Sequence, residues 1–171
     1  LPFWTGCDIA GDVAQVGAAV RDVQVGDRVA VNPNLSCGRC EYCRRGEHSM
    51  CVKYGILGEH THGGLAEYAV NHVNTLYRIP DGVDYDEATV VMTSGSPLFG
   101  LENAGGYFAG ETVAVLGPGP IGLMAIQLVK ALGATRVILT GTRPSRLAMG
   151  RQLGADVLVN SRETDPVAAV M

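Results

Sequence analysis

The sequence predicts an α/β protein in which a small β domain with a four-cysteine lobe precedes a doubly wound parallel sheet. Three features carry this prediction: valine-rich runs separated by glycines over residues 8–31, four cysteines within residues 37–51, and alternating strand and helix patterns from residue 112 onward. Such alternation is typical of βαβ units with right-handed crossovers. We expect the first domain over residues 1–93 and the second over residues 94–171.

The composition is that of a globular protein. Of the 171 residues 47% are hydrophobic and 18% are charged, with a net charge of -4. This charge, without a run of Lys or Arg, does not suit a nucleic-acid partner. No apolar stretch approaches the roughly 20 residues that a membrane-spanning helix needs. Because no signal-peptide pattern is present and the first residue is Leu1, we expect a fragment of a cytoplasmic protein that binds neither nucleic acid nor membrane.

Valine-rich runs that end in glycine turns predict the strands of the first domain. They cover Asp12–Val16 and Val25–Val31, and a later β stretch is expected over Gly64–Arg78, before the turn at Ile79–Gly82. Between these runs, residues 32–56 carry four cysteines and many charges without an apolar period. This lobe has too few apolar residues to fold on its own.

The four cysteines have the spacing C-x2-C-x2-C-x7-C. Short C-x2-C turns place successive sulfurs around one point, as tetrahedral zinc requires. Disulfides are disfavoured in a cytosolic chain, and an iron-sulfur cluster is the stronger rival, although ferredoxin-like runs continue with x3-C-P and this one does not. The sequence predicts a structural zinc with four protein ligands and no open position for substrate. The ligands are Cys37, Cys40, Cys43 and Cys51.

A helix is expected over residues 87–104, across the predicted change of domain near Ser94. The following pattern then predicts, in order, a strand at Thr112–Leu116, a helix at Pro120–Leu132, a strand at Arg136–Thr140, a helix at Ser145–Leu153 and a strand at Asp156–Val159.

A G-x-G-x-x-G motif lies between the first strand and the first helix of this alternation. Its strand-loop-helix context makes it specific for a dinucleotide site. Gly117 allows the tight turn, Gly119 lets the backbone approach the pyrophosphate, and Gly122 permits close helix packing, with the anion at the helix N-terminus. A glycine loop used only for packing is the alternative. The predicted cofactor-binding residues of the loop are Gly117, Pro118, Gly119, Pro120, Ile121 and Gly122.

The end of the second strand indicates which cofactor binds. An NAD site places Asp or Glu about 20 residues after the motif, to hold the ribose 2′-hydroxyl. Here the strand continues into Gly141–Pro144, which contains no carboxylate. Thr142 and Arg143 can donate hydrogen bonds to a 2′-phosphate, with Arg146 as a helper, so NADP is favoured over NAD. The alternative is that Arg143 is a solvated loop charge.

Three segments resemble the zinc-containing medium-chain alcohol dehydrogenase superfamily: Val25–Val31, Cys37–Cys43 and Gly63–Tyr68. The resemblance extends over essentially the whole chain. It implies a GroES-like β domain with a structural zinc lobe, followed by a Rossmann domain. It also implies hydride transfer between a nicotinamide and a small-molecule alcohol, aldehyde or ketone, in a homodimer or homotetramer. A similar Gly-Ser-Arg-Pro turn in NADP-dependent relatives favours the same cofactor.

The resemblance also implies where a catalytic zinc would lie. Zinc-dependent members hold it through an early Cys, the His of a Gly-His-Glu motif, and a later Cys, Asp or Glu. Cys7 and Asp8 align with that motif and are possible ligands, whereas Met92, at the third position, offers a thioether that suits zinc poorly. Alternatively, Cys7 is a buried small residue and Met92 fills the core. Ser96 aligns with a residue that contacts the nicotinamide.

The sequence therefore predicts a zinc-binding, NADP(H)-dependent oxidoreductase of the alcohol dehydrogenase type. A quinone or enone reductase without catalytic zinc is the rival among enzymes, supported by Cys7, Asp8 and Met92. A dinucleotide-binding protein without turnover is a third hypothesis. No residue identifies the substrate.

Overall fold

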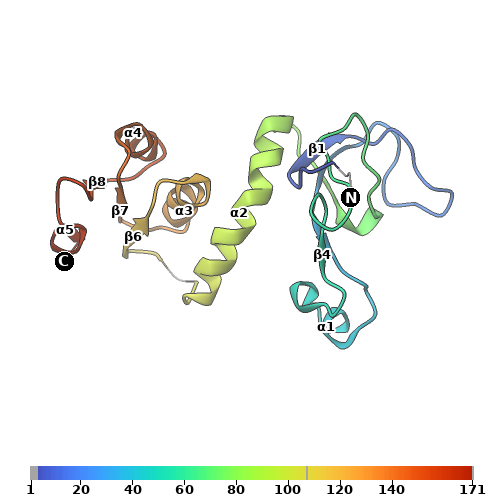
Figure 1. The fold of residues 1–171 in the computed structure, drawn as a ribbon, viewed down its shortest axis with the longest axis horizontal. Helices are drawn as coiled ribbons and strands as arrows, with labels where there is room; N and C mark the ends of the chain where they lie inside the picture. Colours follow the sequence, from blue (N-terminus) through green and yellow to red (C-terminus); the bar gives the residue numbers. More distant parts are fainter. Residues whose placement is uncertain (1–3, 107, 171) are drawn as a thin grey trace. The chain divides into compact units, whose positions relative to one another are not determined.

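A computed structural model describes residues 4–106 and 108–170 of the chain (Figure 1). The chain divides into two compact units, Leu1–Met92 and Thr93–Met171. The first unit holds antiparallel β structure and the cysteine lobe, and the second holds a parallel sheet. This is the predicted order of a β domain and a doubly wound sheet.

The main sheet of the first unit has three antiparallel strands in the order β1-β2-β5. The strands are β1 (Ile9–Asp12), β2 (Arg28–Val31) and β5 (Leu76–Arg78). In the central strand β2, Val29 and Val31 are buried. Ala30 lies opposite Ala10 on one side and Tyr77 on the other.

The first strand lies earlier in the chain than expected. It covers Ile9–Asp12, whereas the valine pattern predicted Asp12–Val16. Val13 still exchanges backbone hydrogen bonds with the returning chain, because its N–H donates to Asp27 (2.9 Å) and its carbonyl accepts from Gly26 (2.9 Å). Beyond Val13 the chain enters a loop, so the register with β2 ends there.

The predicted β stretch over Gly64–Arg78 is mostly wrong. Only its last three residues form β5, preceded by the short 3-10 helix η2 (Val73–Thr75). The amides at the start of the stretch are used elsewhere: Gly64 donates to Gly6 (2.9 Å) and Leu65 donates to Thr5 (3.0 Å). Among the described residues no strand pairs with 66–72, and alternation alone does not form a strand without a partner.

The cysteine lobe is closed by a two-stranded ribbon. Its strands are β3 (Asn34–Leu35) and β4 (Gly55–Ile56), and the loop between them contains the short helix α1 (Glu41–Arg44) and the 3-10 helix η1 (His48–Met50). Only Cys43 and Cys51 are buried within this loop. The lobe therefore lacks an apolar core of its own, as its composition predicted.

The helix α2 (Tyr85–Asn103) begins two residues before the expected start. Its start is fixed by a reciprocal capping arrangement in which the Glu87 N–H donates to the Asp84 carboxylate (2.7 Å) and the Asp84 N–H donates to the Glu87 carboxylate (3.0 Å). Of the two capping residues, Asp84 lies before the predicted helix and Glu87 is its first residue.

From residue 112 to residue 160 the second unit alternates strand and helix in the predicted order, with element ends within one or two residues of those expected, and the short final helix that follows was not predicted. Its elements are β6 (Thr112–Leu116), α3 (Pro120–Ala131), β7 (Arg136–Gly141), α4 (Pro144–Gln152), β8 (Val157–Asn160) and α5 (Pro166–Val170). The strands are parallel in the order β6-β7-β8.

The core of the second unit lies between its sheet and helices α3 and α4, which contact each other as well as the strands (Figure 1). Ile126 and Val129 of α3 and Val137 and Leu139 of β7 have no exposed surface, and Leu147 of α4 is almost fully buried. These residues hold the carboxyl end of β7 and the start of α4 in fixed positions. In the part of the chain that the structure describes, no helix is long and apolar enough to cross a membrane.

Asp156 connects α3 to the sheet. Its carboxylate accepts hydrogen bonds from Lys130 (2.6 Å) and from the Val137 N–H (2.6 Å). The hydrogen bond from Lys130, followed by that from Val137, holds the pKa of Asp156 below its usual value of 3.8. A carboxyl whose pKa is lowered by folding stabilises the fold in its charged form.

We predict that Asp156→Asn lowers the stability of the second unit at pH 7 by a few tenths to about 1 kcal/mol, as for a partly exposed ion pair. Because the folded pKa is depressed, this contribution is complete above pH 3.8 and disappears as the pH falls through the lower folded value. Thermal unfolding of both proteins between pH 7 and pH 3 measures the difference. The control is Asp22→Asn, because Asp22 is exposed and forms no ion pair with another described residue. An equal loss of stability in Asp22→Asn would contradict the stabilising role of the Asp156 carboxylate.

Candidate functional site

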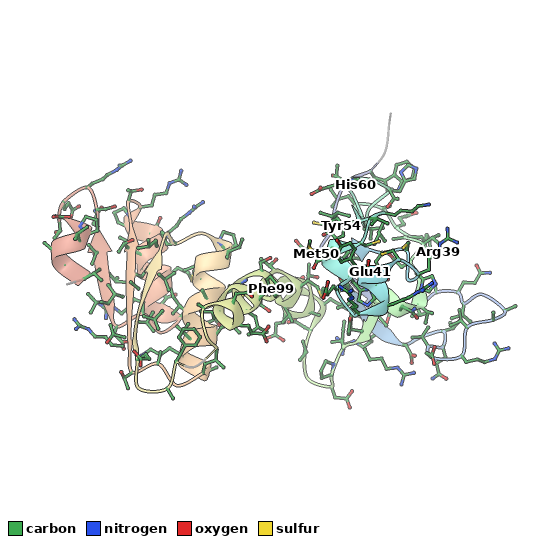
Figure 2. The ribbon with its side chains drawn as sticks, turned by 90° about the horizontal axis from the view of Figure 1, so that it is seen from below. Arg39, Glu41, Met50, Tyr54, His60 and Phe99 are labelled. Carbon is green, nitrogen blue, oxygen red and sulfur yellow. The ribbon has the colours of Figure 1, made fainter. Side chains whose placement is uncertain are left out.

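The four predicted zinc ligands converge on one point. The sulfurs of Cys37, Cys40, Cys43 and Cys51 all lie within 4.8 Å of one another, and those of Cys40 and Cys43 are 3.5 Å apart. All five cysteines of the chain are free thiols, so the disulfide alternative has no support. Side chains of the surrounding lobe, among them Arg39, Glu41, Met50 and Tyr54, are drawn in Figure 2.

Local backbone geometry places each sulfur. Cys40 caps the N-terminus of α1, and Cys43 follows one turn later on the same helix. Cys51 comes directly after η1, and its sulfur accepts hydrogen bonds from the backbone N–H of Cys37 (3.2 Å) and of Lys53 (3.3 Å). Backbone donors of this kind stabilise a thiolate, which is the form that binds metal.

The pKa values of the thiols diverge in this cluster. Backbone hydrogen bonds from Cys43 and Val52 lower the pKa of Cys40 to about 6. Burial, followed by the neighbouring sulfur of Cys40, raises the pKa of Cys43 to about 11. Four thiols this close cannot all ionise without a compensating cation, because like charges disfavour one another. A divalent ion at their centre removes that conflict, so the donor set fits zinc.

The glycine loop has the geometry that a dinucleotide site needs. Gly117 has φ +101°, a conformation that side chains strongly disfavour. A β-carbon on Gly122 would lie 2.0 Å from the carbonyl oxygen of Gly117, so only glycine lets α3 begin this close to the turn. Gly119 caps α3, and Pro120 occupies its first position. The loop therefore presents backbone and a helix N-terminus, which is where a phosphate binds.

The loop after β7 lies next to this turn. The Gly117 N–H donates to the carbonyl of Thr140 (2.9 Å), which ties the glycine loop to the end of β7. Arg143 caps the N-terminus of α4 through its carbonyl, which accepts from the N–H groups of Arg146 (3.1 Å) and Leu147 (3.0 Å). The side chains of Thr142, Arg143 and Arg146 are exposed.

A depression of about 280 Å³ joins the two loops. It is lined by Pro118, Pro120, Leu123, Ser145, Arg146 and Met149. Neither Arg143 nor Arg146 forms an ion pair with another described residue, so both guanidinium groups are available to an anion. No carboxylate lies at the end of β7, and the site can accept a ligand that carries phosphate.

The residues that align with the catalytic-zinc motif, Cys7 and Asp8, do not form a metal site like that of the four cysteines. Cys7 is half-buried and Asp8 is exposed. Met92 packs against the apolar cluster of Ala30, Ile79 and Ala88. Among the described residues, the only group of three or more His, Cys, Asp or Glu side chains close enough to hold a metal is the four-cysteine set. In the part of the chain that the structure describes, no third metal-binding side chain therefore lies close to Cys7 and Asp8. Ser96 lies exposed on α2.

A close backbone contact at this position was not predicted. Gly6 lies against the Gly63-Gly64 pair, and a β-carbon on Gly63 would be 2.3 Å from the carbonyl oxygen of Gly6. The Gly63 N–H donates to the Trp4 carbonyl (2.8 Å), and the Trp4 ring contacts the His62 ring with centroids 4.3 Å apart and the ring planes tilted by 38°. The glycine doublet was the only sequence signal for it. Its effect is to fix the backbone next to Cys7.

The sequence of both units is similar to that of known dehydrogenases. A model of the alcohol dehydrogenase GroES-like domain matches residues 1–81, and a model of zinc-binding dehydrogenases matches residues 120–171. Sorbitol dehydrogenase of Bacillus subtilis is 35% identical over 99% of the chain and 48% of its own length. L-threonine 3-dehydrogenase of Francisella philomiragia is 37% identical over 95% of the chain and 46% of its own length.

A solved structure shares the fold closely. A protein from Sinorhizobium meliloti 1021, described as a zinc-binding dehydrogenase bound to NADP, superposes with a TM-score of 0.92 at 32% identity. The match covers 99% of this chain and 49% of that one. The chain thus spans about half the length of the relatives it matches.

The two family models match residues in both units, the relatives align over almost the whole chain, and the clustered cysteines lie where the resemblance implied a zinc lobe. The chain belongs to the zinc-containing medium-chain alcohol dehydrogenase superfamily, with a GroES-like domain followed by a Rossmann-type parallel sheet.

Proposed function

We propose that the protein is an NADP(H)-dependent oxidoreductase that moves hydride between the nicotinamide and an alcohol or carbonyl carbon. One observation carries the cofactor assignment: the end of β7 has no carboxylate and is followed by the exposed Thr142 and Arg143, beside the glycine loop. The NADP-bound relative adds support. The cofactor supplies the hydride chemistry, and the protein binds and orients it.

Each part of the loop has a role in this proposal. Gly117 and Gly119 let the backbone approach the pyrophosphate, and the first amides of α3 donate to it. Arg143, with Thr142, donates to the 2′-phosphate, and Arg146 adds positive charge nearby. We assign Ser96 to the nicotinamide end of the cofactor, on the resemblance alone.

We further propose that Cys37, Cys40, Cys43 and Cys51 bind a structural zinc. The argument is their convergence within 4.8 Å and the lack of an apolar core in the lobe. Four protein ligands leave no position for a substrate, so this zinc takes no part in the reaction. A reducing, cytoplasmic compartment suits four thiolates and a free Cys7, because an oxidising one would favour disulfides.

A second candidate is a reductase of quinones or enones that works without a catalytic zinc. The packing of Met92 in an apolar cluster favours it, because a thioether held there is not available to a metal. Among the described residues the family's catalytic-zinc position does not fit zinc, and we derive no step through one. A dinucleotide-binding protein without turnover would share the cofactor site but act on no alcohol, ketone or enone.

We predict that Arg143→Ala weakens NADPH binding roughly 10- to 100-fold, since a charge-assisted hydrogen bond contributes about 1.5–3 kcal/mol. NADH binding changes little, because NADH lacks the 2′-phosphate. Titration of the reduced nicotinamide fluorescence measures both dissociation constants.

The matched control is Arg151→Ala, in the helix α4 that Arg143 caps; the guanidinium of Arg151 donates instead to the Asp156 carbonyl. It should affect both cofactors equally. If Arg143→Ala weakened NADH as much as NADPH, the NADP assignment would be wrong.

We predict that Cys43→Ser, at the buried ligand, removes the zinc of the lobe and makes the lobe sensitive to proteolysis. Structural zinc contributes on the order of 10 kcal/mol of folding free energy, which this lobe cannot replace. Zinc content per chain, measured by mass spectrometry, and limited proteolysis report the two effects.

Cys7→Ser is the matched control and should leave the zinc of the lobe in place. In the full-length protein it also separates the two enzyme candidates. Two zincs that fall to one with Cys7→Ser would indicate a dehydrogenase with a catalytic zinc. One zinc in both proteins, with activity on enones, would indicate the reductase.

A further inference from the structure

Position 141, the last residue of β7, is closed to any side chain. An ideal β-carbon there would lie 2.5 Å from Cδ and 2.7 Å from Cγ of Pro118, and 3.3 Å from a methyl group of Leu147. Carbon atoms in contact normally stay about 3.5–4.0 Å apart. The proline ring of the glycine loop therefore intrudes by about 1 Å on the space that a side chain at 141 would need.

Neither partner of this contact can move away easily. Pro118 is buried, and Leu147 is 4% exposed in the core of the second unit. The Gly141 carbonyl accepts the Ser161 N–H (2.9 Å), which fixes the end of β7 against β8. The Gly117 N–H bonds to the neighbouring Thr140 carbonyl (2.9 Å), which fixes the start of the glycine loop. Both sides are held by backbone hydrogen bonds.

The location gives the contact a functional meaning. In dinucleotide-binding folds the carboxylate that selects NAD comes about 20 residues after the glycine motif, at the end of the second strand. Gly141 occupies that place in this chain. We propose that Pro118 is a positioning residue for cofactor choice: its ring keeps position 141 glycine and so excludes the carboxylate that would hold the ribose of NAD and repel a 2′-phosphate. This inference rests on the proposed NADP(H) site.

Pro118, and not Pro120, blocks a side chain at position 141. The two atoms closest to the ideal β-carbon are the ring atoms Cδ and Cγ, which alanine lacks. Pro120 is exposed at the first position of α3 and contributes none of the three closest atoms. Pro118→Ala therefore opens the space at Gly141, and Pro120→Ala does not.

The steric part is tested without cofactor. Gly141→Ala should lower the Tm by several degrees, and adding Pro118→Ala should recover part of that loss, in a double-mutant cycle with Pro118→Ala alone as the fourth corner. Adding Pro120→Ala to Gly141→Ala should recover nothing. Simple additivity of the Gly141→Ala and Pro118→Ala losses would overturn the proposed contact.

The functional part is tested with Gly141→Asp in three backgrounds: wild-type loop, Pro118→Ala and Pro120→Ala. Dissociation constants for NADPH and NADH are measured by nicotinamide fluorescence. We expect Gly141→Asp alone to weaken both cofactors, and Pro118→Ala to restore NADH selectively, shifting the ratio of the two constants at least tenfold relative to the Pro120→Ala background.

A role in loop stability alone would change both constants by the same factor, and an unchanged ratio would overturn the proposal. The proposal would also be overturned if Gly141→Asp alone preferred NADH as strongly as the variant that combines Gly141→Asp with Pro118→Ala. A wild-type protein that binds NADH as tightly as NADPH would instead refute the proposed cofactor. The Tm cycle would still test the contact between Pro118 and position 141 in that case.

Discussion

Close approach of backbone to backbone, with no side chain between, is the constraint that shapes the glycine loop of the second unit and the backbone beside Cys7 in the first unit. In the first unit the carbonyl of Gly6 lies where a β-carbon on Gly58 or Gly63 would be, and in the second the carbonyl of Gly117 lies where a β-carbon on Gly122 would be. Glycine is required at such contacts because any Cβ would separate the segments. Packing, rather than flexibility, therefore requires Gly58, Gly63 and Gly122.

The cysteine lobe is held together in a different way. It has no apolar core, each of its two strands is two residues long, and its environment lowers the pKa of Cys40 while raising that of Cys43. Backbone N–H groups already point at the sulfur of Cys51. The fold thus brings the four sulfurs together, and the zinc proposed for them would stabilise the lobe as hydrophobic burial stabilises the rest of the chain.

The parts of the fold that the sequence predicted are those specified by local pattern. The alternation from Thr112 to Asn160 was predicted with errors of one or two residues, since helix and buried-strand periodicities are local. The stretch from Gly64 to Arg78 was mispredicted because strand formation depends on a partner, and its first amides bond to Thr5 and Gly6 instead. Cysteine spacing predicted the convergence of four sulfurs, and Met92 packs beside Ala30 and Ala88, as the alternative of a core-filling side chain predicted, although the sequence could not name these neighbours.

Cofactor choice in this fold is usually assigned to the residues at the end of the second strand. Here that end cannot be considered apart from the glycine loop, because the ring of Pro118 occupies the space beside Gly141 and both segments are tied through Thr140 and Ser161. A carboxylate at 141 requires the backbone or the ring to move by about 1 Å in a region packed against Leu147. In the proposed site, the choice between NADP and NAD then depends both on the glycine loop and on the loop after β7. A carboxylate introduced at position 141 can bind the ribose of NAD only if the ring of Pro118 leaves room for it.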